Sequence, residues 1–71
     1  MSTDNRTLRR QLDRELTALE DRYLALRDLK SDGALAGQPM ATILQFDNAV
    51  ESIAAAMQHL RNVIDILGKS E

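Results

Sequence analysis

The apolar residues in the second half of the chain follow one another at alternating steps of three and four. They are Ile43, Phe46, Val50, Ile53, Met57, Leu60, Ile64 and Leu67. The same spacing recurs in the first half at Leu12, Leu16, Leu19, Tyr23 and Leu26, with Arg9 and Lys30 at its two ends. An apolar repeat of this kind keeps one side of a helix apolar and is typical of a coiled-coil seam. The sequence therefore predicts an all-α chain with two helices of matched length, and it predicts Tyr23 as a core residue.

A single break separates the two repeats. Gly33 suits a left-handed helix C-cap, Gly37 adds a flexible point, and Pro39 suits the first turn of a new helix. We therefore predict helices at about 5–31 and 39–67, with Gly68 as the stop of the second helix. A connection this short favours antiparallel neighbours. The prediction is one helical-hairpin domain over 1–71, with a polar tail at about 1–4, a tip loop at about 32–38 and a C-terminal tail at 68–71.

The length of the chain makes a partner necessary. With 71 residues it lies at the small end of what forms one hydrophobic core, and such chains usually need a staple or a partner. The sequence contains no cysteine, which excludes disulfides and thiolate metal sites as the staple. Helix packing through oligomerisation is the route that remains.

The apolar surface of the predicted hairpin is wider than one seam. With Ile43 as heptad position a, one flank of the seam, formed by positions g and c, carries Leu8, Ala18, Ala25 and Leu29 on the first helix and Ala49, Ala56, Val63 and Ile66 on the second. We call this side the g flank. The opposite side, the e flank, is charged and carries Asp13, Glu20, Arg27, Asp47 and Arg61. An apolar arc of about 180° is more than one hairpin can bury against itself.

A homodimeric four-helix bundle is the simplest way to cover this arc. The candidate dimer interface is Leu8, Ala18, Ala25, Leu29, Ala49, Ile53, Ala56, Leu60, Val63 and Leu67. Glu15 and Arg22, both at position g, are predicted to form edge ion pairs that set orientation. The alternative is that the g flank is a docking surface for a different protein.

A short basic row opens the first helix. Arg6, Arg10 and Arg14 recur every four residues and share a face in the first turns, where bases work against the helix macrodipole. Such a row suits phosphates or an acidic protein surface. The alternative interpretation is that these arginines compensate the negative charge at the carbonyl end of the second helix, where Asp65 and Glu71 also lie.

Four further apolar residues are candidates for a partner-binding patch. Leu24 and Leu44 both fall at position b and should be exposed, and Leu35 and Met40 lie near the tip. Grouped apolar side chains near one end of a hairpin favour protein docking.

Residues with the chemistry of an active site are missing from the sequence pattern. There is no nucleophile–base pair, Gly-rich phosphate loop or metal spacing, and for the single histidine, His59, the nearest acid at helical spacing is Glu51, two turns away. The run from Leu8 to Asp13 is slightly similar to the opening helix of all-helical chorismate mutases, but the chain lacks a third helix and the buried cations of that chemistry. We expect no enzymatic activity, no cofactor, no metal and no small-molecule substrate.

The leading functional hypothesis is a small homodimeric regulator or adaptor that binds another protein and inhibits or sequesters it. Hairpins of this format are encoded by phages, plasmids and bacterial regulatory circuits, which is an analogy from architecture. The alternative is an RNA-binding dimer, because small plasmid RNA-regulating hairpins of the Rop type share this architecture. A net charge of −2, with one Tyr and one Phe, does not favour nucleic acid. A structural or assembly component is the third hypothesis.

The polar start of the chain and its mildly acidic second half bear on location. Met1 to Arg10 has no apolar core of the kind a secretory signal needs, and no stretch approaches the roughly 18 apolar residues of a membrane span. The polar face of the second helix also lacks the lysines and arginines of membrane-surface helices. We therefore expect a cytoplasmic protein that does not bind membranes.

Overall fold

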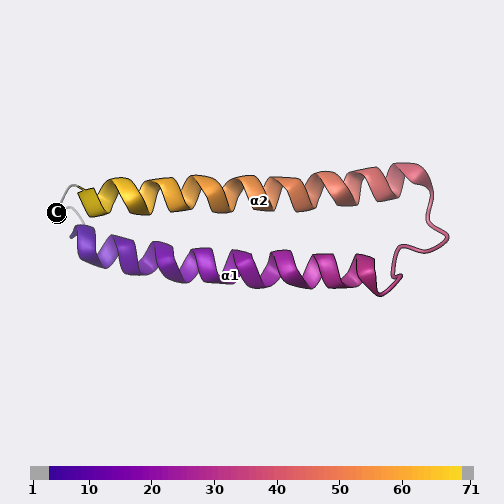
Figure 1. The fold of residues 1–71 in the computed structure, drawn as a ribbon, viewed down its shortest axis with the longest axis horizontal. Helices are drawn as coiled ribbons and strands as arrows, with labels where there is room; N and C mark the ends of the chain where they lie inside the picture. Colours follow the sequence, from indigo (N-terminus) through magenta and orange to yellow (C-terminus); the bar gives the residue numbers. More distant parts are fainter. Residues whose placement is uncertain (1–3, 70–71) are drawn as a thin grey trace.

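The chain forms two long antiparallel helices joined by one tip loop (Figure 1). The computed structural model describes residues 4–69, in which α1 spans Asn5–Ser31 and α2 spans Met40–Lys69. The hairpin measures 51 × 20 × 17 Å, so it is a rod one helix pair thick. The predicted all-α hairpin is confirmed. The predicted N-terminal tail falls mostly outside the described residues, and Asp4 directly precedes α1.

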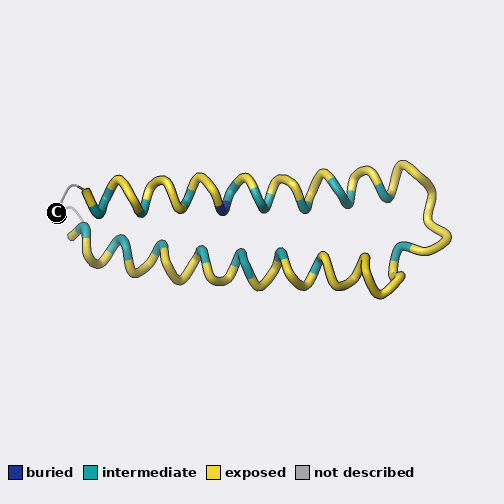
Figure 2. Tube along the Cα trace, in the orientation of Figure 1, coloured by how far each residue is buried: buried dark blue, intermediate teal, exposed yellow. Residues whose placement is uncertain are grey.

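The core is a single seam between the facing sides of the helices (Figure 2). Every residue of the two predicted repeats, from Leu12 to Leu26 in α1 and from Ile43 to Leu67 in α2, is half-buried or buried. Only Met57 falls below a tenth exposed among the described residues, with 6% of its surface accessible at the middle of the seam. The spacing of three and four therefore predicted the packing correctly, and it also shows how thin the core is.

Two backbone hydrogen bonds close the end of α1. The N–H of Gly33 donates to the carbonyl of Lys30 (3.1 Å), and the N–H of Ala34 donates to the carbonyl of Leu29 (3.0 Å). Gly33 itself has a φ of 86°, so the end of α1 is a Schellman motif with the predicted glycine at its left-handed position. Gly37, with a φ of 79°, then allows the second turn of the tip.

The ends of α2 differ from the prediction. The helix begins at Met40, one residue later than expected, because Pro39 stands just outside it and accepts hydrogen bonds from the N–H groups of Thr42 (3.0 Å) and Ile43 (3.2 Å). The prediction that Gly68 stops the helix and opens a tail at 68–71 is wrong, since α2 continues to Lys69. Gly68 does not have the positive φ that a left-handed stop requires. Residues 70–71 of the predicted tail lie outside the described part.

Within residues 4–69, neither helix is both long enough and apolar enough to cross a bilayer.

Candidate functional site

The e flank is closed by charges that join the two helices. Lys30 Nζ lies 2.7 Å from Asp47 Oδ1 near the tip, and Arg61 Nη2 lies 3.5 Å from Glu20 Oε1 nearer the open end. Arg27, a further residue of this flank, has its guanidinium carbon 5.7 Å from the centroid of the Tyr23 ring, a cation–π distance. The hairpin thus uses much of the e flank for its own internal contacts.

The g flank remains open. Leu29 is 48% exposed, Val63 42% and Ile66 61%, although all three are large aliphatic residues. The small residues of this flank, Ala18, Ala25 and Ala49, are exposed as well, while Leu8 and Ala56 are half-buried. The predicted interface residues Ile53, Leu60 and Leu67 lie in the seam and are half-buried. An aliphatic strip therefore runs along one side of the seam without a covering element.

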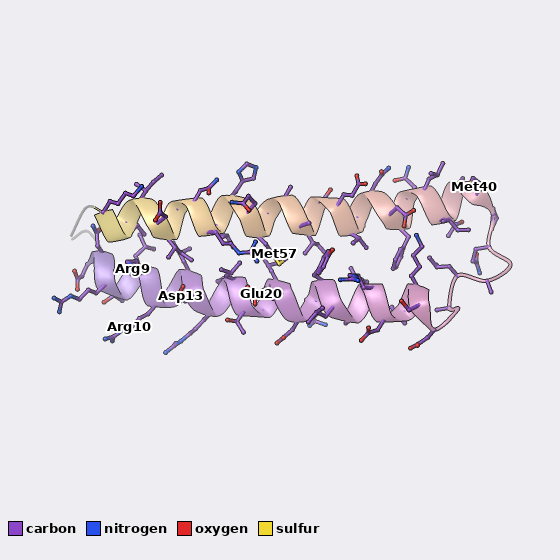
Figure 3. All side chains as sticks on the ribbon, viewed as in Figure 1. Arg9, Arg10, Asp13, Glu20, Met40 and Met57 are labelled. Atoms are coloured by element: carbon purple, nitrogen blue, oxygen red, sulfur yellow. The ribbon has the colours of Figure 1, made fainter. Side chains whose placement is uncertain are left out.

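The basic row lies on the outside of the open end. Arg6, Arg10 and Arg14 are all exposed, and in Figure 3 Arg10 points away from α2. Arg6 and Arg10 border a shallow hollow of about 210 Å³ together with Arg9 and Asp13, whereas Arg14 lies outside it. Two of the three predicted residues are brought together.

Arg9 is the arginine that meets the last turn of α2. A Cβ built on Gly68 would lie 3.6 Å from the Arg9 guanidinium carbon, an ordinary van der Waals distance, so the Arg9 side chain lies directly over this glycine. Asp65, which we expected to be near the basic row, is paired with Lys69 at 3.1 Å. Glu71, the other expected acid, lies outside the described residues.

A groove that was not predicted from the sequence lies between the helices at the open end. Its volume is about 330 Å³, and it is lined by Arg9, Asp13 and Leu16 of α1 and by Arg61, Ile64, Asp65, Gly68 and Lys69 of α2. The lining mixes three cations with two carboxylates on an apolar floor. The one signal in the sequence was a glycine at an e position opposite Arg9, which removes a side chain from the e flank.

The predicted patch near the tip is present in part. Met40 is 67% exposed, Leu44 54% and Leu24 52%, whereas Leu35 is half-buried. Met40 and Leu44 are four residues apart and share one face of α2. Leu24 belongs to α1 and lies seven residues before its end, so the apolar pair at the tip is Met40 with Leu44.

His59 is exposed on α2. Among residues 4–69 there is no group of three His, Cys, Asp or Glu side chains arranged to hold a metal ion.

Comparison of the chain with protein-family models, with curated proteins and with solved structures gave no match.

Proposed function

We propose that this chain is a non-enzymatic cytoplasmic regulator or adaptor that dimerises through the g flank and binds another protein with the surfaces that the dimer leaves free. The exposed aliphatic strip of the g flank carries this proposal. A hairpin with one buried residue among those described gains much of its stability from any partner that covers Leu29, Val63 and Ile66. A second copy is the partner that is always present at the same concentration.

The free surfaces have complementary chemistry for a protein partner. The basic row offers exposed guanidinium groups, which bind carboxylates in a bidentate manner. Met40 and Leu44 offer an exposed apolar surface at the tip, and its burial by a partner would contribute free energy to binding. The two surfaces lie at opposite ends of the hairpin (Figure 3), so the basic row fits an acidic surface of a partner and the tip fits an apolar pocket.

A Rop-like RNA-binding dimer remains the second candidate because the same exposed guanidinium groups also suit phosphates. The net charge of −2 and the scarcity of aromatic residues argue against it.

Light scattering at micromolar concentration tests the dimer. We expect twice the mass of the chain, and a stable monomer would refute self-association through the g flank. Affinity capture from the native host, with and without nuclease, then tests the class of partner. Capture that survives nuclease supports a protein partner, whereas nuclease-sensitive capture with a steep salt dependence supports RNA.

The basic row is tested by replacing Arg6, Arg10 and Arg14 together with Gln. We expect roughly a tenfold or greater loss of partner capture, since charge-assisted hydrogen bonds contribute about 1.5–3 kcal/mol each when well formed. The matched control replaces the same residues with Lys, which keeps the charge but not the planar fork. Unchanged capture by the Gln variant would show that the row has no role in binding.

A further inference from the structure

Glu15 and Arg22 are two opposite charges in the middle of the largely aliphatic g flank, and neither has a counter-charge in its own helix. Glu15 and Arg22 are both exposed, and they are one heptad apart, about 10 Å along α1. Residues three and four positions from either one are uncharged: Gln11, Leu12, Ala18, Leu19, Ala25 and Leu26. Neither Glu15 nor Arg22 takes part in an ion pair within the part of the chain that the structure describes.

The facing helix supplies no counter-charge on this flank either. The pairing of Lys30 with Asp47 and the approach of Arg9 to Gly68 fix the register of α1 against α2 at both ends. In that register the g positions of α2 level with Glu15 and Arg22 are Val63 and Ala56. The two charges therefore have no counter-charge within the hairpin, and a covering partner without counter-charges would bury them at a cost of free energy.

The g positions of α1 are, in chain order, Leu8, Glu15, Arg22 and Leu29. When two copies of α1 are aligned in opposite directions about the middle of this series, each Glu lies opposite an Arg and each Leu lies opposite a Leu. We infer that the covering partner is a second copy of this chain whose α1 runs antiparallel to the first α1, so that Glu15 of each copy faces Arg22 of the other and Leu8 faces Leu29. This inference rests on the proposed self-association and specifies its geometry. The two-fold axis crosses α1 between residues 18 and 19, close to the middle of the helix.

The other way to stack two such hairpins with two-fold symmetry has the axis along the rod. That arrangement lays α1 of one copy on α2 of the other, in the same register as within the hairpin. Glu15 and Arg22 would then face Val63 and Ala56 of the second copy, and both charges would be covered by aliphatic groups. The charge pattern of the g flank disfavours this arrangement.

The inferred axis gives a consistent packing for α2 as well. Because the register within the hairpin places the axis between residues 59 and 60 of α2, Ala56 of one copy faces Val63 of the other, a small residue opposite a larger one. The first turns of α2, with Met40 and Leu44, extend beyond the second copy. The dimer thus leaves one apolar tip free at each end.

Cysteine cross-linking tests the orientation, because the chain has no cysteine of its own. We expect a mixture of the L8C and L29C variants to form a disulfide-linked dimer under mild oxidation. Each variant alone is the control, since two copies of residue 8 would lie about 30 Å apart in the inferred dimer. A mixture of L29C and A49C, positions that the alternative axis would bring together, should not cross-link.

Charge reversal tests the Glu15–Arg22 pairing. The E15R variant carries two positive charges on the flank and the R22E variant two negative ones. We expect each alone to dimerise about tenfold more weakly than the parent, and their mixture to form heterodimers at least as readily as the parent forms homodimers.

The outcomes separate the geometry from self-association itself. A dimer by light scattering that cross-links only through L29C with A49C, or through neither mixture, overturns the inferred orientation and leaves the proposed dimer standing. A monomer overturns both. Single charge reversals that leave dimerisation unchanged, with no heterodimer preference in the mixture, overturn the Glu15–Arg22 pairing.

Discussion

The e flank and the g flank border the same seam, but charged pairs join the helices along the e flank and exposed aliphatic residues line the g flank. Along the e flank, Lys30 reaches Asp47 and Arg61 reaches Glu20 across the gap between the helices. Along the g flank, aliphatic residues of the two helices lie side by side, with Leu29 and Val63 more than two-fifths exposed. Charges on one side thus join the two helices of the chain, and the largely aliphatic side is left uncovered.

In the proposed dimer, one heptad pattern encodes two interfaces, one within the chain and one between two copies. Surface ion pairs contribute little free energy, but they discriminate between alternative pairings. Apolar area contributes more free energy and less direction. Three substitutions test the different roles of the seam and the two flanks, and each has a control substitution on the outer surface of the hairpin.

A substitution in the seam, which both flanks border, should have the largest effect on the free energy of unfolding. M57A removes most of the side chain of the buried methionine and should lower the free energy of unfolding by about 3 kcal/mol, within the range for such truncations. Urea denaturation followed by circular dichroism measures the loss. Q58A, on the exposed neighbour, is the control and should change stability by less than about 0.5 kcal/mol. Equal losses in the two variants would contradict the assignment of Met57 to the core.

On the g flank, A56R should weaken self-association without unfolding the hairpin. The long side chain can reach solvent in a single hairpin, but in a dimer it would be covered, which should cost about 2 kcal/mol or roughly a thirtyfold higher dissociation constant. Sedimentation velocity over a concentration series measures this. The control is A55R, one residue away on the outer face. If both variants associate equally well, the g flank is not the interface.

A substitution on the e flank should have the smallest effect. It should change the stability of the hairpin and leave its self-association unchanged. D47N removes the charge that pairs with Lys30 and should lower stability by about 0.5 kcal/mol, since both side chains are partly exposed. The loss should shrink in 1 M NaCl, where exposed charges are screened. D21N, on the outer face of α1, serves as the control in the same urea titrations. A change of oligomeric state in D47N would contradict the separation of the two flanks.

The seam and the tip were predictable from the sequence because both depend on local rules. Residues spaced by three and four share a helix face whatever surrounds them, and Gly33 meets the left-handed position of a Schellman motif through its own neighbours. The end of α2 was not predictable in this way. Gly68 stays helical and lies beneath the Arg9 side chain, a contact between the first and last turns of the two helices.

The groove at the open end was missed for the same reason. Its walls come from both helices, and its volume depends on how Arg9 lies against the missing side chain of Gly68. Heptad letters give the face of each residue but not its level along the partner helix. The exposure of Leu24 and Leu44 was predicted correctly, because position on the helix surface decides it. Leu35 lies in the loop, where periodicity carries no information.

The Schellman tip also sets the order in which the hairpin can assemble. The contact nearest to it, between Lys30 and Asp47, closes a segment of only 17 residues, whereas the contact of Arg9 with Gly68 joins nearly opposite ends of the chain. Closing a short loop costs less entropy than closing a long one, so contacts between the helices should form first near the tip and then progressively towards the termini. The same gradient runs in reverse when the chain opens, and amide hydrogens near the termini should exchange with solvent sooner than those near the tip.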